Sequence, residues 1–467
     1  MSTTSLHLGD KRSLDGKRGL GPYTLSPDAL LTHGVIVGMT GSGKTGLVTV
    51  LVEEALRAEI PVLVVDIKGD LPNLALAFPD FDAARMTPWV EPAPRDDDGI
   101  ADPPLVESAI DARKRGLARS GLGEAELAEF GARTLVRVIT PGSSGGEELH
   151  LLSALERRSP RWDHDAAGAR ATLSAAISLV LRLVGRESDP GRSKEHALLS
   201  VLAEARLTRG HDASLDALVL EVIEPPLETI GALAVDEFVS PKARRELAAD
   251  LNTVLATPSF VSWRRGQSID VARWMEPVED KTPATIVSVA HLDDEERMLV
   301  LGVLLEEVLS WVRGLSGTGH LRALVVLDEV YGLLPPHPAS PATKRPLVAL
   351  MKQARAYGVG CVLATQNPMD LDYRALSNAG TWCLGRLQTD ADRARVLDGL
   401  GEDARRSKLA ETLKALGPRW FVVRDAKTST PSLLFPRHAM SYLRGPMTPE
   451  EIRRARQGRE ASAGAGA

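Results

Sequence analysis

Hydrophobic residues along the chain alternate between short apolar runs and stretches of helical periodicity. The first such unit has an apolar run at 34–37, a glycine-rich turn, a helical pattern at 45–58 and a second apolar run at 62–65. Short apolar runs predict buried strands, and apolar residues at three-and-four spacing predict an amphipathic helix. This order predicts a βαβ unit with parallel strands and a right-handed crossover.

Later apolar runs extend this pattern. They predict strands at 135–139, 285–289, 324–327, 360–364 and 382–384, and a hairpin of 421–423 with 432–435. Residues 105–130 show helical periodicity, whereas the Pro- and Asp-rich segment 91–104 is expected to be an exposed linker. The sequence therefore predicts an α/β fold with a mainly parallel sheet.

The segment 150–280 has a different character, with helical periodicity and few β-branched runs. Prolines divide it into short helices, at positions 189, 225, 226, 241 and 258. We expect an all-helical insertion that splits the core into 31–149 and 281–449. Residues 1–30 are rich in Gly, Pro and Ser and predict a loop or short hairpin that caps the core. The segment 450–467 is charged and then small, and is expected to be a flexible tail.

Composition narrows the class of protein. The 467 residues carry a net charge of −6, with 43% apolar and 25% charged residues, which is typical of a globular protein. The longest apolar candidate for a membrane span, near 175–184, is interrupted by Arg182, and the N-terminus lacks an apolar signal core. The two cysteines, Cys361 and Cys383, have no metal-ligand spacing. We therefore expect a cytoplasmic protein without a membrane partner.

Residues 38–45 fit the phosphate-loop pattern G-x-x-x-x-G-K-[ST], between a predicted strand and a predicted helix. Such a loop directs backbone N–H groups at the phosphates of a nucleotide, and the helix N-terminus adds its positive end. Lys44 is expected to reach the β- and γ-phosphates, and the Thr45 hydroxyl to bind Mg²⁺. The candidate nucleotide-binding residues are Gly38, Thr40, Gly41, Ser42, Gly43, Lys44 and Thr45.

Polar residues follow other predicted strands. Asp328 and Glu329 end the run 324–327; Asp328 is expected to bind Mg²⁺ through water, and Glu329 to polarise the water that attacks ATP. Gln366 follows the run 360–364 and could contact the γ-phosphate or that water, or cap the strand end. Asp66 and Lys68, after the run 62–65, are either coupling residues or a strand-end salt bridge.

These elements, in this order, resemble the HerA–FtsK superfamily of RecA-like motor ATPases. The loop reads GMTGSGKT and the strand end at 364–368 reads ATQNP. The resemblance covers about 30–449 and is closest to HerA-like ATP-binding proteins. Their further hallmarks are similar to segments 33–34, 66–70, 290–292, 352–355, 385–389 and 441–446.

The resemblance implies a RecA-like P-loop NTPase core and ATP hydrolysis with Mg²⁺, coupled to movement on double-stranded DNA by a hexameric ring. An arginine from the neighbouring subunit completes such sites, with Arg355 as the first candidate and Arg386 as the second. HerA carries an N-terminal β-barrel that docks a nuclease. About 30 residues precede the core here, which is short for a closed barrel, so a nuclease partner has little support.

Two alternatives stay open at this point. An ATPase with the same core could drive protein translocation or secretion, or a nucleotide-gated scaffold could bind partners without motor output. Glu329 argues against the scaffold, because a binding switch does not need a carboxylate that polarises water. The basic clusters 113–115 and 263–265 could contact DNA phosphates, although a solvated helix face and a packed Trp explain them more simply.

Overall fold

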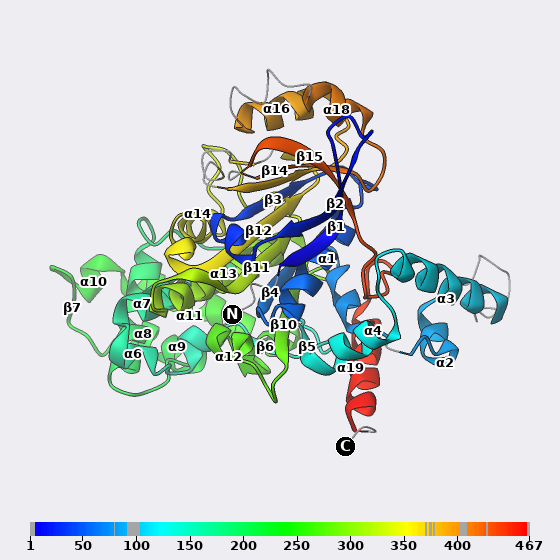
Figure 1. Cartoon of the computed structure of the whole chain (residues 1–467). Coiled ribbons are helices and arrows are strands. Elements are labelled where there is room, and N and C mark those ends of the chain that lie inside the picture. The colour runs from blue at the N-terminus through cyan, green and yellow to red at the C-terminus, as the bar shows by residue number, and fades with distance from the viewer. Residues whose placement is uncertain are drawn as a thin grey trace.

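The computed structural model describes residues 5–78, 80–90, 103–368, 371–372, 376, 379–400, 409–425 and 428–464. Within these residues an eleven-stranded sheet organises the molecule (Figure 1). Its strands are β1 (Leu6–Arg12), β2 (Gly19–Leu25), β3 (Gly34–Val37), β4 (Val62–Asp66), β5 (Thr134–Ile139), β10 (Thr282–Ser288), β11 (Thr318–Asp328), β12 (Tyr357–Thr365), β13 (Thr381–Leu384), β14 (Phe421–Asp425) and β15 (Thr428–Pro436).

The central part of the sheet is parallel. Its strands follow the order β13-β3-β12-β11-β4-β10-β5, and the antiparallel strands β14, β15, β1 and β2 continue the sheet beyond β13. The predicted α/β fold with a mainly parallel sheet is confirmed. The predicted strands and the hairpin of β14 with β15 are present at the expected positions.

The order of the strands adds what the sequence could not supply. Strands β3 and β4 are parallel, as the βαβ pattern predicts, but β12 and β11 lie between them. Two segments from late in the chain thus occupy the centre of the sheet, beside the strand that leads into the phosphate loop.

Alternate residues of the parallel strands enter two hydrophobic cores, one on each face of the sheet. In β4, Leu63 and Val65 face one core, whereas Val62 and Val64 face the other. Burial on both faces explains why these strands read as continuous apolar runs. Helices α1 (Lys44–Arg57), α3 (Pro103–Ala118) and α4 (Glu124–Arg133) cover one face, and α13 (Asp294–Gly314) and α14 (Lys344–Gln353) cover the other.

The region predicted as helical at 105–130 is two helices, α3 and α4, because the chain turns at Gly121 with a φ of 68°. Of the predicted linker 91–104, residues 91–102 lie outside the described residues, and 103–104 begin α3. The smaller helical elements are α2 (Ala83–Met86), α16 (Asp390–Leu400), α18 (Leu409–Ala415), η1 (Pro27–Thr32), η2 (Leu71–Ala75), η3 (Thr87–Trp89), η4 (Pro258–Arg264) and η5 (Ala354–Ala356).

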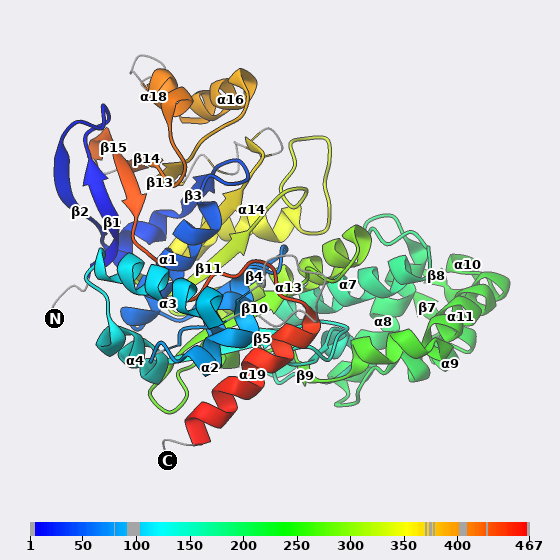
Figure 2. The same ribbon diagram turned by 90° about the vertical axis from the view of Figure 1, so that its right-hand side faces the viewer.

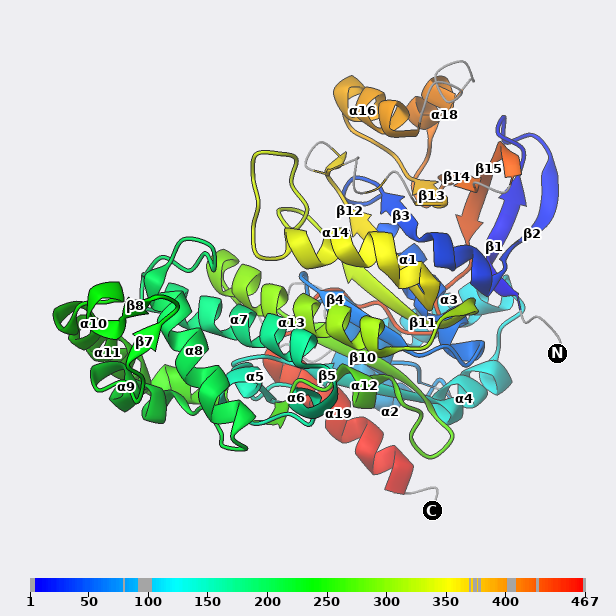
Figure 3. The same cartoon turned by 90° about the vertical axis from the view of Figure 1, so that its left-hand side faces the viewer.

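The segment between β5 and β10 forms a mainly helical unit at the end of the molecule opposite the β1–β2 hairpin (Figures 2 and 3). Its helices are α5 (Ser153–Glu156), α6 (Arg161–His164), α7 (Ala166–Leu183), α8 (Lys194–Thr208), α9 (Leu215–Ile223), α10 (Val235–Phe238), α11 (Pro241–Ala256) and α12 (Val271–Met275). The expectation of an all-helical insertion was wrong in one respect. The pairs β6 (Leu149–His150) with β9 (Gln267–Ser268), and β7 (Thr229–Ile230) with β8 (Leu233–Ala234), form two small sheets.

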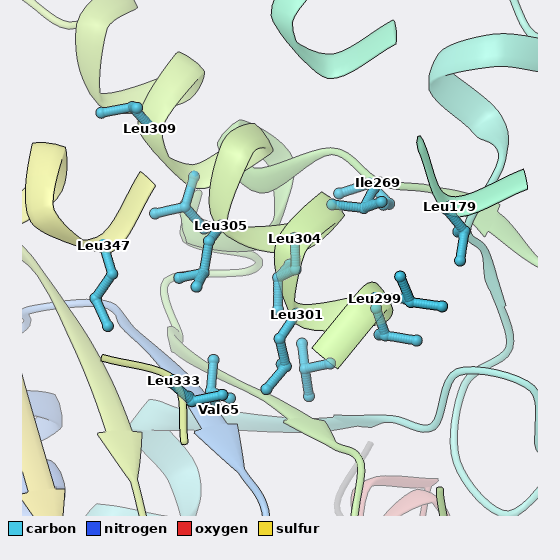
Figure 4. Packing of buried hydrophobic residues seen from close by; sticks show 14 of the residues in the cluster. Val65, Leu179, Ile269, Leu299, Leu301, Leu304, Leu305, Leu309, Leu333 and Leu347 are labelled. Atoms are coloured by element: carbon cyan, nitrogen blue, oxygen red, sulfur yellow. The ribbon is translucent and has the colours of Figure 1, made fainter. Parts of the chain in front are cut away.

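Helix α13 joins this unit to the sheet. A capping box of Asp293 and Glu296 starts the helix. Its leucines lie between Val65 of β4 and Leu179 of α7 (Figure 4). Because one helix packs on both the sheet and α7, the insertion and the core share a single hydrophobic cluster.

Helix α7 is the one helix among the described residues that is long and apolar enough to cross a membrane by length and composition. Its mean hydropathy is 1.3. In this structure it packs against α8 and α13, and the core helix of a soluble protein passes the same test. The absence of a membrane partner stays a prediction.

The first and last described elements of the chain are attached to the core. The predicted N-terminal hairpin is formed by β1 and β2, which add to the sheet through β15. The segment expected to fray after residue 450 instead forms α19 (Pro449–Gly464). Its Ile452 and Ala455 are buried against Leu76 and Trp89. Two apolar residues one turn apart therefore dock a helix that its charged composition did not indicate.

Candidate nucleotide-binding site

The predicted polar residues meet at the carboxyl edge of the parallel sheet. The phosphate loop follows β3, and Asp66, Asp328 and Gln366 stand at or just beyond the ends of β4, β11 and β12. The register pairs Asp328 with Asp66 and with Ala364, which brings the three strand ends level. Ligands of open parallel sheets bind at this edge.

Backbone contacts and glycine conformations shape the phosphate loop. Gly43 precedes α1 with a φ of +90°, a conformation that side-chain-bearing residues rarely adopt. A Cβ at this position would also lie 3.0 Å from Cγ of Arg419. The loop is tied to the strand beside β3 by the Gly38 N–H, which donates to the carbonyl of Thr365 at 3.1 Å. The backbone conformation thus favours glycine at residue 43, and Arg419 leaves little room for a side chain there.

Glu329 lies at the centre of the site. Its Oε2 contacts Nζ of Lys44 at 3.0 Å and Nζ of Lys68 at 2.8 Å, and accepts a hydrogen bond from Nε2 of Gln366 at 2.7 Å. Its Oε1 accepts from the Gln366 N–H at 3.1 Å and from Oγ1 of Thr365 at 3.2 Å. The structure therefore brings together Lys44, Glu329 and Gln366, which the sequence placed in one site from three distant segments.

These contacts determine the charge of Glu329. Burial acts to raise the pKa of this carboxyl, but Lys44 and the hydrogen bonds from Lys68 and Gln366 outweigh it and hold the pKa at about 2. Burial lowers the pKa of Lys44, and the carboxylates of Asp328 and Glu329 oppose that shift. Glu329 is thus a carboxylate at neutral pH, as activation of a water molecule requires.

Asp328 and Asp66 form a second, more deeply buried pair of carboxyl groups. Burial raises the pKa of Asp66 to about 7, helped by the charge of Asp328, and burial raises the pKa of Asp328 to about 6. Asp66 accepts hydrogen bonds from Oγ of Ser288 and from the Gly69 N–H, each at 3.0 Å. Within the described residues, neither carboxylate oxygen of Asp328 has a hydrogen-bond partner.

The residues around Asp328 fit a magnesium ion. A buried carboxyl without donors is costly unless a cation or ordered water satisfies it, and Mg²⁺ prefers oxygen ligands and retains several waters. Thr45, in the first turn of α1, offers the hydroxyl that phosphate-loop proteins use for the same ion. Mg²⁺ held there would neutralise negative charge on the phosphate oxygens of a bound nucleotide.

The two candidate arginines lie in different places. Arg386 is exposed, and its carbonyl accepts from the Met39 N–H at 2.9 Å, so it lies beside the phosphate loop of its own chain. Arg355 is exposed in η5, directly before β12. Since the site lies beyond the opposite end of this nine-residue strand, roughly 30 Å away, Arg355 does not join the site of its own chain.

Three contacts were not anticipated from the sequence. Thr365 donates to Glu329, and a polar residue directly before Gln366 at the strand end was the available signal. Lys68 was considered beside Asp66, but its ion pair with Glu329 required the strand order. Arg419 donates its backbone N–H to the carbonyl of Ser42 at 2.9 Å, and nothing in its local sequence indicates this contact.

The two basic clusters considered for DNA contact pack within the chain. Arg113 donates to the carbonyls of Ala77 and Met440, and its guanidinium lies over Phe78 and Phe81. Trp263 is 8% exposed. Its neighbour Arg264 pairs with Glu156 and Asp216, at 2.9 Å and 2.7 Å. The packed Trp expected for the cluster 263–265 is present, whereas Arg113 departs from the solvated helix face expected for 113–115; Lys114, Arg115 and Arg265 are exposed.

A glycine-rich phosphate loop, a strand-end Asp–Glu pair and a neighbouring strand-end Gln at one edge of a parallel sheet define a P-loop NTPase. Residues 18–88 match the family model described as "Helicase HerA, central domain" (DUF87). The resemblance to the HerA-type ATPases is confirmed over this segment, which includes the phosphate loop and residues 66–70.

Solved structures share the fold over nearly the whole chain. VirB4 of Thermoanaerobacter pseudethanolicus is 14% identical with a TM-score of 0.53, and the match covers 94% of this chain and 97% of that one. The plasmid coupling protein TrwB in complex with ADP and Mg²⁺ is 14% identical with a TM-score of 0.52, covering 91% and 90%. No curated protein sequence matches the chain. These similarities show the fold, which the chain shares with VirB4 and TrwB.

Proposed function

We propose that this protein is a motor of HerA type that hydrolyses ATP with Mg²⁺ and moves double-stranded DNA, as a translocase or helicase-like enzyme. The main support for ATP hydrolysis is the position of Glu329, which contacts Lys44 of the phosphate loop and Gln366 of the neighbouring strand end. A carboxylate beside the phosphate lysine is placed to polarise water, which a switch without turnover does not need. The DNA track is supported by the match to the HerA central domain.

The proposal includes assembly as a hexameric ring in the cytoplasm. In such a ring, only the surface of the channel needs positive charge to bind DNA. A net charge of −6 for the whole chain is therefore compatible with DNA as the track. A protein-translocation or secretion ATPase is the second candidate. It is favoured by the similarity of most of the chain to VirB4 and to TrwB, a bacterial conjugative coupling protein.

The test is the steady-state rate of ATP hydrolysis, with and without double-stranded DNA, at low and moderate salt. We expect hydrolysis that DNA stimulates, with less stimulation at the higher salt because phosphate contacts are screened. Hydrolysis without stimulation at either salt would reject DNA as the track and favour the secretion candidate.

Two variants separate binding from turnover. Lys44→Ala is expected to abolish nucleotide binding, because it removes the cation that holds the β- and γ-phosphates. Glu329→Gln is expected to bind ATP and to lose turnover, since an amide cannot accept the proton of the attacking water. Fluorescent nucleotide binding and phosphate release measure the two steps. Equal loss of binding in both variants would contradict the role assigned to Glu329.

A further inference from the structure

Two ammonium groups converge on one oxygen of Glu329. Lys44, in the phosphate loop, places its Nζ 3.0 Å from Oε2. Lys68, in the loop after β4, places its Nζ 2.8 Å from the same oxygen. Burying two like charges beside each other is unfavourable unless enough negative charge is present. Glu329 is the carboxylate that both ammonium groups contact, and the charge of Asp328 also acts on Lys44. Two ammonium groups directed at one point suit a phosphate group, which carries several charged oxygens in one place.

The hydrogen bonds to Glu329 leave no acceptor position for a water molecule. A carboxylate offers about four lone-pair positions. Glu329 is contacted by five donors, namely Nζ of Lys44, Nζ of Lys68, Nε2 and the backbone N–H of Gln366, and Oγ1 of Thr365. To polarise an attacking water, Glu329 must therefore lose at least one of these donors.

Of the two ammonium donors, Lys68 is the one that can leave more easily. Its side chain is 31% exposed, whereas that of Lys44 is 5% exposed. The backbone next to it is fixed, because the Gly69 N–H donates to Oδ1 of Asp66 at 3.0 Å and the Gly69 carbonyl accepts from the Met447 N–H at 2.9 Å. The flexible four-carbon stem of Lys68 can thus turn while its loop stays in place.

We propose that Lys68 is a second phosphate-binding cation that moves from Glu329 to the γ-phosphate of ATP and thereby frees Glu329 for catalysis. This inference rests on the proposed ATPase function and adds a catalytic residue to it. A terminal phosphate carries more charge than a carboxylate and has three acceptor oxygens, so it competes effectively for an ammonium group. Contact with the terminal phosphate makes Lys68 selective for a triphosphate.

The hydrolysis step then balances within the site. The water oxygen forms a bond to the γ-phosphorus while the bond from that phosphorus to the bridging oxygen breaks, and ADP leaves with the bridging oxygen. Glu329 accepts the proton of the water and afterwards returns it to the released phosphate. Lys68 stays protonated throughout and neutralises charge on the γ-phosphate oxygens.

The experiment compares the affinities for ATPγS and ADP, each with Mg²⁺, in Lys68→Ala and in Lys68→Ala combined with Glu329→Gln. We expect ATPγS to bind to each Lys68→Ala variant roughly 10- to 100-fold more weakly than to the protein that has Lys68 and the same residue 329. This is the effect expected when one charge-assisted hydrogen bond is lost. ADP affinity should change by less than about twofold. Retained ADP binding also reports that the variant is folded, and Lys68→Gln provides a second neutral variant.

The Glu329→Gln background is the decisive comparison. If Lys68 only neutralises Glu329, its removal has no selective effect once that charge is absent, and the ratio of the two affinities stays unchanged. Such an unchanged ratio, or equal weakening of both nucleotides, would overturn the proposal. Lys68→Arg should restore part of the selectivity. Lys242→Ala, at an 89% exposed lysine paired with Glu246, is the matched control and should change neither affinity.

These measurements need no turnover, so they separate the two hypotheses. Absence of hydrolysis in the unmodified protein would reject the proposed ATPase, whereas selective loss of ATPγS binding in Lys68→Ala would still support the role of Lys68. With an active protein, Lys68→Ala should in addition lower kcat.

Discussion

At the scale of single residues, the site holds Glu329 in an unusual backbone conformation. Its φ is 69°, in the left-handed region that residues with a side chain rarely adopt. Such a conformation costs about 1–3 kcal/mol and persists where surrounding contacts impose it. Here the ion pairs with Lys44 and Lys68 and the hydrogen bonds from Gln366 hold the carboxylate toward the phosphate loop.

His33, unlike Glu329, lies outside the nucleotide site and has a structural role. It is 2% exposed, and its Nδ1 accepts a hydrogen bond from the Cys361 N–H at 3.1 Å. Burial lowers the pKa of His33 from 6.5 to about 4, so the ring is neutral in the folded protein at neutral pH. His33 thus joins the start of β3 to β12, on the edge of the sheet away from the nucleotide site.

This shift predicts a loss of stability in mild acid. Between pH 6.5 and 4 the unfolded chain binds a proton at His33 and the folded chain does not, so stability falls as the pH falls through this window. The contribution between pH 6.5 and 5 is up to about 2 kcal/mol. Urea unfolding of His33→Asn should show a shallower pH dependence than the unmodified protein. The exposed residue His211 provides the control variant His211→Asn, and equal slopes in all three proteins would contradict the assignment.

At the scale of elements, the segment 437–448, here called the C-terminal strap, links helix α1 to the loop of Lys68. Arg437 is buried and pairs with Glu53 and Glu54 of α1 at 2.8 Å and 2.9 Å. Further along the strap, the Met447 N–H donates to the Gly69 carbonyl. The helix that begins at the phosphate loop and the loop that carries Lys68 are therefore held by one segment from the end of the chain.

Removal of Arg437 is expected to destabilise the fold strongly. Arg437→Met removes the arginine that pairs with the buried carboxylate of Glu53 and leaves Glu54 with Arg57 as its ion-pair partner, which costs about 3–5 kcal/mol. Urea unfolding measures this change. The matched control is Arg133→Met, because Arg133 pairs with Glu59 at 2.5 Å on the surface, with both side chains more than half exposed, and such pairs contribute less than about 1 kcal/mol. Similar effects of both substitutions would show that the buried cluster does not hold the strap.

At the scale of the whole molecule, the position of Arg355 bears on assembly. It lies at the edge of the sheet opposite the nucleotide site, so it can serve as an arginine finger only for a neighbouring subunit. A site made from Lys44 and Glu329 of one subunit would then be completed by Arg355 of the next.

This arrangement predicts complementation between inactive variants. Arg355→Ala and Glu329→Gln should each be inactive alone. Mixing them should restore part of the ATPase rate, because an Arg355→Ala subunit supplies an intact Glu329 and its Glu329→Gln neighbour supplies an intact Arg355. Particle mass with a non-hydrolysable ATP analogue checks that rings form, and co-purification through an affinity tag on one variant checks that they are mixed. Mixed rings without recovered activity would exclude Arg355 as the finger, and Arg386 beside the phosphate loop would be the next variant.

Much of the nucleotide site was predictable because its residues follow strands. Apolar runs identified β3, β11 and β12, and the polar residues after each run had to meet at one edge of a parallel sheet. The phosphate loop, Asp328, Glu329 and Gln366 were therefore found from local pattern alone. Arg419 and the C-terminal strap were not, because their contacts with the loop and with α1 join segments hundreds of residues apart and leave no periodic signal.

The sequence by itself determined the class of fold, the phosphate loop and the acidic strand end, because burial on both faces and phosphate binding each impose a local residue pattern. Only the tertiary structure decided the strand order, the docking of α19 and the ion pair of Lys68 with Glu329. Parallel strands of similar apolar composition can be ordered in many ways, and packing selects one. Because that order places β11 beside β4, Glu329 at the end of β11 lies within ion-pair distance of Lys68 after β4.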